Sequence, residues 1–162
     1  MFTTFYGGHY QPLAWVTFGL DYLLWGMAPF GYHLTSLILH GANAVIFYFI
    51  ALRLLSLAMQ RDVGLRWAAA FAALLFAVHP LRVESVAWAT ERRDVLSGLF
   101  LLWTVLCYLK AVAAGQSDAT RWRWMGLAGV AYFFSLLSKG SGMSLPLVLL
   151  VLDVYPLRRL GG

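Results

Sequence analysis

Residues Leu34–Leu52, LTSLILHGANAVIFYFIAL, form a long run without a formally charged side chain. As an α-helix with a rise of about 1.5 Å per residue, this run is long enough to cross a hydrocarbon core of about 30 Å. A helix is the expected conformation because the bilayer core offers no water to unpaired backbone groups. The run therefore predicts a membrane-spanning helix.

The composition of the 162-residue chain also favours lipid over water as its solvent. Hydrophobic residues make up 61% of the chain and charged residues 12%, whereas about 25% of residues are charged in soluble domains. The formal net charge is +5, but the 12 basic residues lie in short clusters between apolar runs. A nucleic-acid partner would need them on one face. We therefore expect an integral membrane protein, in a bacterial inner membrane or its equivalent, with no nucleic-acid partner.

Five further apolar stretches are Leu13–Met27, Trp67–Val78, Val95–Ala114, Trp124–Leu137 and Met143–Tyr155. The first contains Asp21 and several aromatic residues, so it suits an interfacial or tilted helix as well as a spanning one. The sequence thus predicts an all-α, polytopic helical membrane protein with five or six apolar helices. We expect a single helical module over residues 1–162, with an outer segment in residues 1–32 and a helical bundle in residues 33–160.

The basic residues are divided unequally between the two sides of this predicted bundle. The more basic side carries Arg53, Arg61, Arg66, Lys110, Arg121, Arg123, Arg158 and Arg159. The other side carries Arg82, Arg92, Arg93 and Lys139, together with Glu84, Glu91 and Asp94. Cytoplasmic loops carry the excess of Lys and Arg. We therefore predict that the first side is cytoplasmic and that the charge cluster of residues 79–94 faces the periplasm or exterior.

This balanced cluster of acids and bases is the predicted place for chemistry, because ionisable groups near the hydrocarbon are costly and mark substrate or ion paths. Glu84, Trp88 and Glu91 are spaced four and three residues apart, so they would share one face of a helix. Two interpretations stay open. The charges form a structural ion network, or they form a pocket for a phosphate-bearing ligand, to which arginines donate bidentate hydrogen bonds and Lys139 adds a point charge.

A stripe of mostly polar side chains also follows the charge-free run at helical spacing, namely His33, Ser36 or Leu37, His40 and Asn43. At this spacing they face one direction, toward the bundle interior or a water-filled cleft. We interpret His40 and Asn43 as residues that form hydrogen bonds between helices. His33 lies at the outer end of the run, where it could reach a substrate.

Three other residues receive simpler interpretations. Asp21 is a lone carboxylate in an aromatic stretch and is weak evidence for catalysis. Asp153 is expected to pair with one of the arginines that follow it, at the cytoplasmic end of the last span. Cys107 is the only cysteine, so it forms no intrachain disulfide and is expected to be a small buried hydrophobe.

Several motifs occur together in a fixed order. They are Gly31-Tyr32-His33-Leu34-Thr35, Leu39-His40, His79-Pro80 with Glu84-Ser85-Val86, Arg92-x-Asp94, and Ser138-Lys139 with Pro146 and Asp153. In this combination the chain resembles the membrane module of the transmembrane and tetratricopeptide-repeat proteins. These include O-mannosyltransferases and belong to the C-type membrane glycosyltransferases. The resemblance runs from about Tyr10 to Leu160.

The resemblance implies a partial C-type glycosyltransferase bundle. Such an enzyme takes a sugar from a polyprenyl-phosphate carrier in the membrane lipid and transfers it to an acceptor, such as a protein, on the outer side. It also implies that His79, Glu84, Arg92, Asp94 and Lys139 line the carrier-phosphate and sugar site. With the residues argued above, the candidate substrate-binding set is His33, His79, Arg82, Glu84, Glu91, Arg92, Asp94 and Lys139.

Catalytic residues stay unassigned, because the acidic pair that the family carries in its first outer loop has no counterpart before Tyr10. For the same reason we expect the chain to be a fragment of a longer protein. The sequence identifies no cofactor and leaves a divalent metal ion open. The alternative class is a non-enzymatic membrane protein, such as a transporter fragment or an assembly subunit, in which the same charges form a transport path or interhelical pairs.

Overall fold

The computed structural model describes residues 11–59, 62–113 and 117–159, and these ranges contain helices and no strand. Residues 1–10 of the predicted outer segment, as well as Arg61, Ala114 and Leu160, lie outside the described residues. The longer helices are α1 (Pro12–Trp25), α2 (Pro29–Ala58), α3 (Val63–Val78), α5 (Arg92–Ala111), α6 (Asp118–Ser138) and α7 (Leu145–Val154). Shorter elements are η1 (Pro80–Arg82), α4 (Val83–Ala87), η2 (Ala89–Glu91) and η3 (Gly140–Ser144).

Local sequence signals explain where several helices begin. Pro12 and Pro29 occupy the first turns of α1 and α2, where the missing N–H of proline costs no helical hydrogen bond. The side chain of Asp62 caps α3 by accepting a hydrogen bond from the backbone N of Val63. Ser117 caps α6 by accepting one from the backbone N of Thr120 at 3.3 Å. These caps satisfy N–H groups that have no partner inside the helix.

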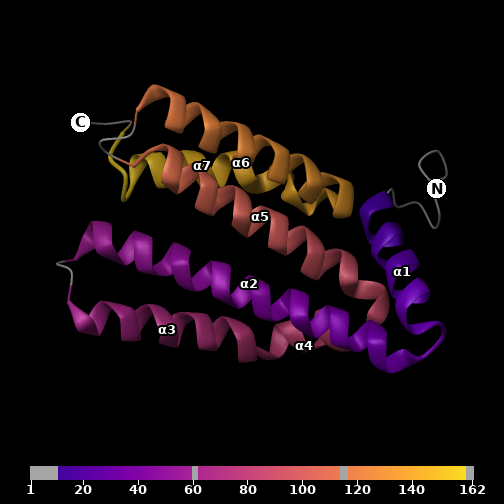
Figure 1. The fold of residues 1–162 in the computed structure, drawn as a ribbon. Helices are drawn as coiled ribbons and strands as arrows, with labels where there is room; N and C mark the ends of the chain where they lie inside the picture. Colours follow the sequence, from indigo (N-terminus) through magenta and orange to yellow (C-terminus); the bar gives the residue numbers. More distant parts are fainter. Residues whose placement is uncertain (1–10, 60–61, 114–116, 160–162) are drawn as a thin grey trace.

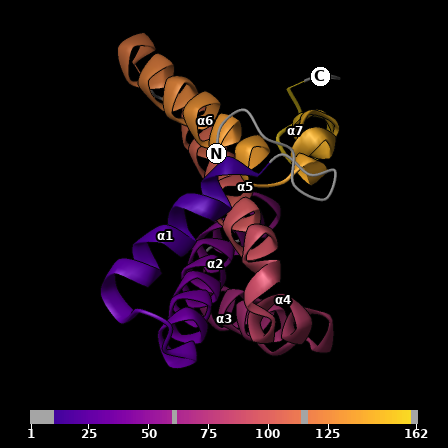
Figure 2. The ribbon, with the colours of Figure 1, turned by 90° about the vertical axis from the view of Figure 1, so that its right-hand side faces the viewer.

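Helix α2 lies between α3 and α5, and α5 packs along α6 (Figure 1). Helix α1 crosses the bundle beside the first residues of α2 and α5, as both views show (Figures 1 and 2). Ile50, Val105, Leu109 and Leu145 form a buried apolar cluster where α2, α5 and α7 meet. Nearer the other end, small residues let α5 and α6 approach closely, and the buried hydroxyl of Ser135 donates to the backbone O of Ser97 at 3.0 Å.

Each of the six apolar stretches overlaps a helix, but fewer helices are long enough to cross a membrane than the sequence predicts. By length and composition, Pro29–Ala58 and Ala89–Ala111 qualify among the described residues. A third span results if Val63–Val78 and Pro80–Ala87 are counted as one helix with a bend of 52° between its two parts. The exterior remains apolar, with large side chains such as Leu23 81% exposed. The chain is thus an all-helical integral membrane protein with two or three long apolar helices, and the predicted five or six are not shown.

The bend also corrects the prediction that Glu84, Trp88 and Glu91 share one helix face. Helix α4 ends at Ala87, and Trp88 takes an extended backbone with φ −92° and ψ 115° before η2 begins. The prediction was wrong because the stretch after Pro80 is broken into three short elements. A spacing of three and four residues aligns side chains only within one continuous helix.

A close approach between α1 and α2 requires the glycine at position 31. A Cβ atom on Gly31 would lie 2.2 Å from Cγ of the Trp25 side chain. We expect Gly31→Ala to lower the free energy of unfolding by about 1–3 kcal/mol, because the indole must move out of its packing. Thermal unfolding in detergent micelles measures this change.

A second background separates this steric effect from helix propensity. In a Trp25→Ala chain the clash is absent, so the same Gly31→Ala substitution is expected to stabilise by up to about 1 kcal/mol. Equal destabilisation in both backgrounds would show that the contact with Trp25 is not the cause.

Candidate functional site

A polar pocket of about 320 Å³ lies between α2, α5 and the segments that follow α3 and α6. We call it the outer pocket, after the side of the membrane on which the sequence predicts its charges to lie. Its polar and charged lining residues include His40, Asn43, Arg82, Ser85, Asp94 and Lys139. They come from α2, η1, α4 and α5 and from the residue between α6 and η3, and Leu101 and Leu102 supply part of the apolar wall.

An ion pair between Asp94 and Lys139 joins two walls of the outer pocket. Asp94 lies in the first turn of α5, where a carboxylate is favoured by the positive end of the helix dipole. Lys139 directly follows α6 in an extended conformation, and its backbone N donates to the O of Ser135 at 3.0 Å. The side chains are 26% and 37% exposed, so both groups remain accessible to a ligand in the pocket.

Arg82 supplies a second cation on the wall that follows the bend. Its guanidinium carbon lies 4.7 Å from the ring centroid of Phe76, and both residues line the outer pocket. Stacking on an aromatic ring holds a guanidinium in place while leaving its edge N–H groups free to donate. The pocket therefore presents one arginine and one lysine, with Asp94 as the carboxylate among its lining residues.

His40 and Asn43 hold α2 to its neighbours, as predicted from the polar stripe. His40 Nε2 lies 3.0 Å from the backbone O of Ala77 at the end of α3. Asn43 Nδ2 donates to the backbone O of Val95 at 2.9 Å. Both residues also line the outer pocket, and the buried Oδ1 of Asn43 has no hydrogen-bond partner among the described residues.

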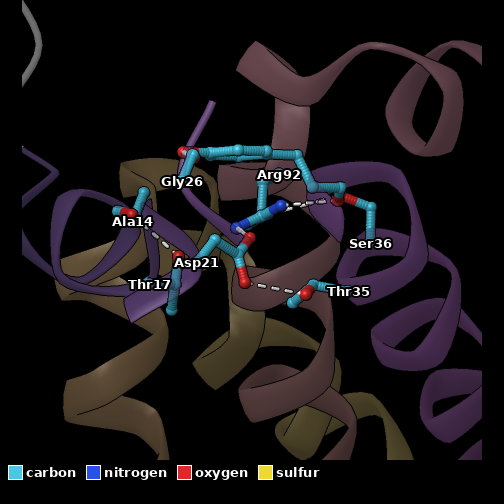
Figure 3. Close-up of polar contacts among 8 residues, drawn as sticks. Ala14, Thr17, Asp21, Gly26, Thr35, Ser36 and Arg92 are labelled. Carbon is cyan, nitrogen blue, oxygen red and sulfur yellow. Dashed lines mark hydrogen bonds and ion pairs between the residues drawn. The ribbon is translucent and has the colours of Figure 1, made fainter. Parts of the chain in front are cut away.

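Arg92 lies in a different environment, at the point where α1, α2 and α5 meet (Figure 3). Its guanidinium forms an ion pair with Asp21 of α1 and donates to the backbone O of Tyr32 at 2.6 Å and to Ser36 Oγ at 3.3 Å. The other carboxylate oxygen of Asp21 accepts from Thr35 Oγ1 at 2.8 Å. Arg92 has 0% exposure, so this arrangement is a buried structural junction.

The remaining predicted site residues lie apart from the outer pocket. Glu91 pairs with Arg93 at 2.9 Å on the surface. His79 is exposed, and its Nδ1 accepts a hydrogen bond from the backbone N of Leu81 at 3.3 Å. His33 and Glu84 are also exposed. The structure thus brings Arg82, Asp94 and Lys139 together in one pocket and places the other five candidates elsewhere.

Sequence reasoning missed part of this site. His40 and Asn43 were assigned only to hydrogen bonding between helices, although a polar stripe also indicates a cleft. Ser85 belongs to the Glu84-Ser85-Val86 motif, but its residue type alone did not indicate a binding role. The described residues contain no group of three or more His, Cys, Asp or Glu side chains that could hold a metal ion.

Toward the opposite end of the bundle, the structure confirms the predicted pairing of Asp153 with an arginine and the predicted burial of Cys107. Asp153 Oδ1 accepts from Arg159 Nη1 at 3.3 Å, and its Oδ2 accepts from the hydroxyl of Tyr108 at 2.6 Å. These contacts fasten the end of α7 to α5. Cys107 is 1% exposed within α5, as expected for a small buried hydrophobe.

Comparison with known proteins identifies relatives along nearly the whole chain. Protein O-mannosyl-transferase tmtc2 of Xenopus laevis is 35% identical over 156 residues, covering 95% of this chain and 18% of that protein. Protein O-mannosyl-transferase TMTC2 of Homo sapiens is 33% identical over the same shares. Protein O-mannosyl-transferase Tmtc3 of Drosophila melanogaster is 32% identical over 165 residues, covering 93% of this chain and 18% of that protein. The chain thus spans 18% of the length of these curated relatives. No protein-family model matches the chain, and no solved structure matches it.

Proposed function

Because this chain is a homologue of the protein O-mannosyl-transferases and corresponds to one segment of them, we propose that it forms part of a membrane glycosyltransferase. In this proposal the outer pocket receives the phosphate of a polyprenyl-phosphate-linked sugar, and the acceptor is a hydroxyl group of a protein. The observation that carries the proposal is the convergence of Lys139 and Arg82 on one pocket between apolar helices.

The chemistry of sugar transfer suits this arrangement. Breaking the bond between the sugar and the phosphate leaves negative charge on the departing phosphate, and preorganised cations stabilise such charge. Lys139 provides a point charge, whereas Arg82 provides a planar set of N–H donors. The apolar wall of Leu101 and Leu102 would accommodate the first part of a polyprenyl chain.

The buried Asn43 suits a sugar in the same pocket. Its Oδ1 is an acceptor without a partner among the described residues, and a buried acceptor without a partner is unfavourable. A hydroxyl group of a bound sugar would donate to it. Arg92 acts differently in this proposal, as a positioning residue that fixes the first turn of α5, from which Asp94 projects.

The membrane orientation is part of the same proposal. Arg53, Arg66 and Lys110 lie toward the other end of the long helices, and the positive-inside rule assigns such an end to the cytoplasm. The outer pocket would then open to the opposite side of the membrane. A protein acceptor would reach it from that side.

The proposal is tested by binding of a short polyprenyl-phosphate mannose to the purified chain in detergent. We expect Lys139→Gln to weaken binding by roughly tenfold or more and Arg82→Gln to weaken it by a similar factor, because each removes a charge-assisted contact to phosphate. Arg123→Gln is the matched control, since it removes one cation from α6 that does not line the outer pocket.

Circular dichroism and size-exclusion chromatography verify that each variant is folded. Binding that is equally strong in Lys139→Gln, Arg82→Gln and the unchanged chain would contradict a phosphate site in the outer pocket. An equal loss in Arg123→Gln would show that general charge, and not this pocket, governs binding.

A further inference from the structure

A second and larger cavity lies toward the opposite end of α2. Its volume is about 900 Å³, and its walls come from α2, the start of α3 and the end of α5. Val45, Phe49 and Leu106 are among its apolar lining residues. Among the residues that the structure describes, none lines both this cavity and the outer pocket, so it is a separate site. We call it the basic cavity.

Three cations line the basic cavity, namely Arg53, Arg66 and Lys110. Arg53 and Arg66 form no ion pair within the part of the chain that the structure describes. Lys110 Nζ lies 4.5 Å from the ring centroid of Trp124, which leaves its N–H groups able to donate. Apolar walls and cations without an acidic partner thus occur together.

The carboxylate of Asp62 also lines the basic cavity but does not neutralise these cations. Asp62 is the N-cap residue of α3. Its Oδ1 accepts a hydrogen bond from the backbone N of Val63 at 2.6 Å. No ion pair joins Asp62 to a cation among the described residues. The lining therefore keeps an excess of positive charge.

We infer that the basic cavity binds an anionic phospholipid. Its acyl chains would lie against the apolar walls of α2 and α5, and its headgroup phosphate would contact Arg53, Arg66 and Lys110. Basic pockets between membrane helices bind anionic headgroups in this way. A purely apolar helix laid over these walls would bury the cations without a counter-charge, which is unfavourable.

Native mass spectrometry of the full chain in detergent tests this inference. The chain is titrated with phosphatidylglycerol or with phosphatidylcholine that carries identical acyl chains. We expect phosphatidylglycerol to bind more tightly than phosphatidylcholine. The double variant Arg53→Gln/Arg66→Gln is expected to weaken phosphatidylglycerol binding by roughly twenty-fold, since each basic residue contributes a factor of about five in affinity. Phosphatidylcholine binding is expected to change far less.

The matched control is Arg121→Gln/Arg123→Gln, which removes two cations from α6 that do not line the basic cavity. We expect this control to keep the preference for phosphatidylglycerol. Equal affinity of the unchanged chain for both lipids, or an equal loss in both double variants, would overturn the inference.

Two further outcomes identify other occupants. Displacement of the bound lipid by a large excess of inorganic phosphate would show that the cations bind free phosphate, and would overturn the role of the acyl chains. A dimer that retains no lipid would assign the basic cavity to a second copy of the chain. Persistence of the lipid under both conditions supports the inference.

Discussion

Replacement of Asp21 by Asn, or of Arg92 by Gln, is expected to lower the free energy of unfolding by about 3–5 kcal/mol. Either change leaves the other charge buried without its partner. The side chains of Arg92 and Asp21 are 0% and 5% exposed, so water cannot compensate for the loss. The same guanidinium also donates to the backbone O of Tyr32 and to Ser36 Oγ. Arg92→Gln would weaken or remove both of these hydrogen bonds.

Chemical unfolding in detergent micelles, followed by circular dichroism, measures this effect. Glu91→Gln is the matched control, because the pair of Glu91 and Arg93 is 23% and 22% exposed and lies beside the same helix start. Exposed pairs contribute at most about 1 kcal/mol. The double variant Asp21→Asn/Arg92→Gln is expected to lose less than the sum of the single losses, since neither charge is then left alone.

A loss for Arg92→Gln no greater than that for Glu91→Gln would contradict the structural role of the buried junction. Arg92 would then be available as a ligand-binding residue, as the resemblance to the transferase family implies. The stability measurement thus decides between the two interpretations of this arginine.

Lys139→Gln is expected to weaken binding of polyprenyl-phosphate mannose, whereas Asp94→Asn is not. Without ligand, Asp94 holds the ammonium group of Lys139 in an ion pair. A bound phosphate competes with this carboxylate for the same cation. Lys139→Gln therefore removes an attraction and also leaves Asp94 to repel the phosphate, which gives a loss of about 10- to 150-fold. Asp94→Asn frees Lys139 and is expected to leave the affinity equal or raise it by up to about tenfold.

The double variant Asp94→Asn/Lys139→Gln is expected to bind with an affinity between those of the single variants. Titration of the four chains under one ionic strength gives the coupling between the two residues. Equal weakening in both single variants would contradict competition for Lys139 and would indicate that Asp94 contacts the ligand directly or that the ion pair only supports the fold. Higher salt is expected to reduce all the differences in affinity, because both groups are partly exposed and salt screens exposed charges.

The sequence predicted the helices better than their ends. The charge-free run Leu34–Leu52 lies inside α2, but α2 begins at Pro29 and continues to Ala58. Proline is favourable in the first turn of a helix, so Pro29 could have indicated this start. The extension past Leu52 includes Arg53, whose long side chain reaches out of an apolar helix and does not end it.

The site was predicted less completely, because its contacts join distant parts of the chain. Asp21 and Arg92 are 71 residues apart in sequence, and no local pattern indicates that a lone carboxylate in α1 would neutralise an arginine in α5. Lys139 and Asp94 were predicted as site residues from their charge and from the resemblance. Their pairing depends on how α5 and α6 pack, which hydrophobic pattern alone does not determine.

The break at the end of α3 has a consequence for the depth of the outer pocket. Helix α3 contains 16 residues and rises about 24 Å at 1.5 Å per residue, less than the about 30 Å of a hydrocarbon core. The last turn of α3, which contains Phe76, would therefore lie below the level of the lipid headgroups, together with the start of the polar segment that follows it. Irregular backbone at that depth requires water or protein around it. The break thus favours a recessed, hydrated vestibule in which a lipid-borne phosphate and a water-borne acceptor could meet without either leaving its own phase.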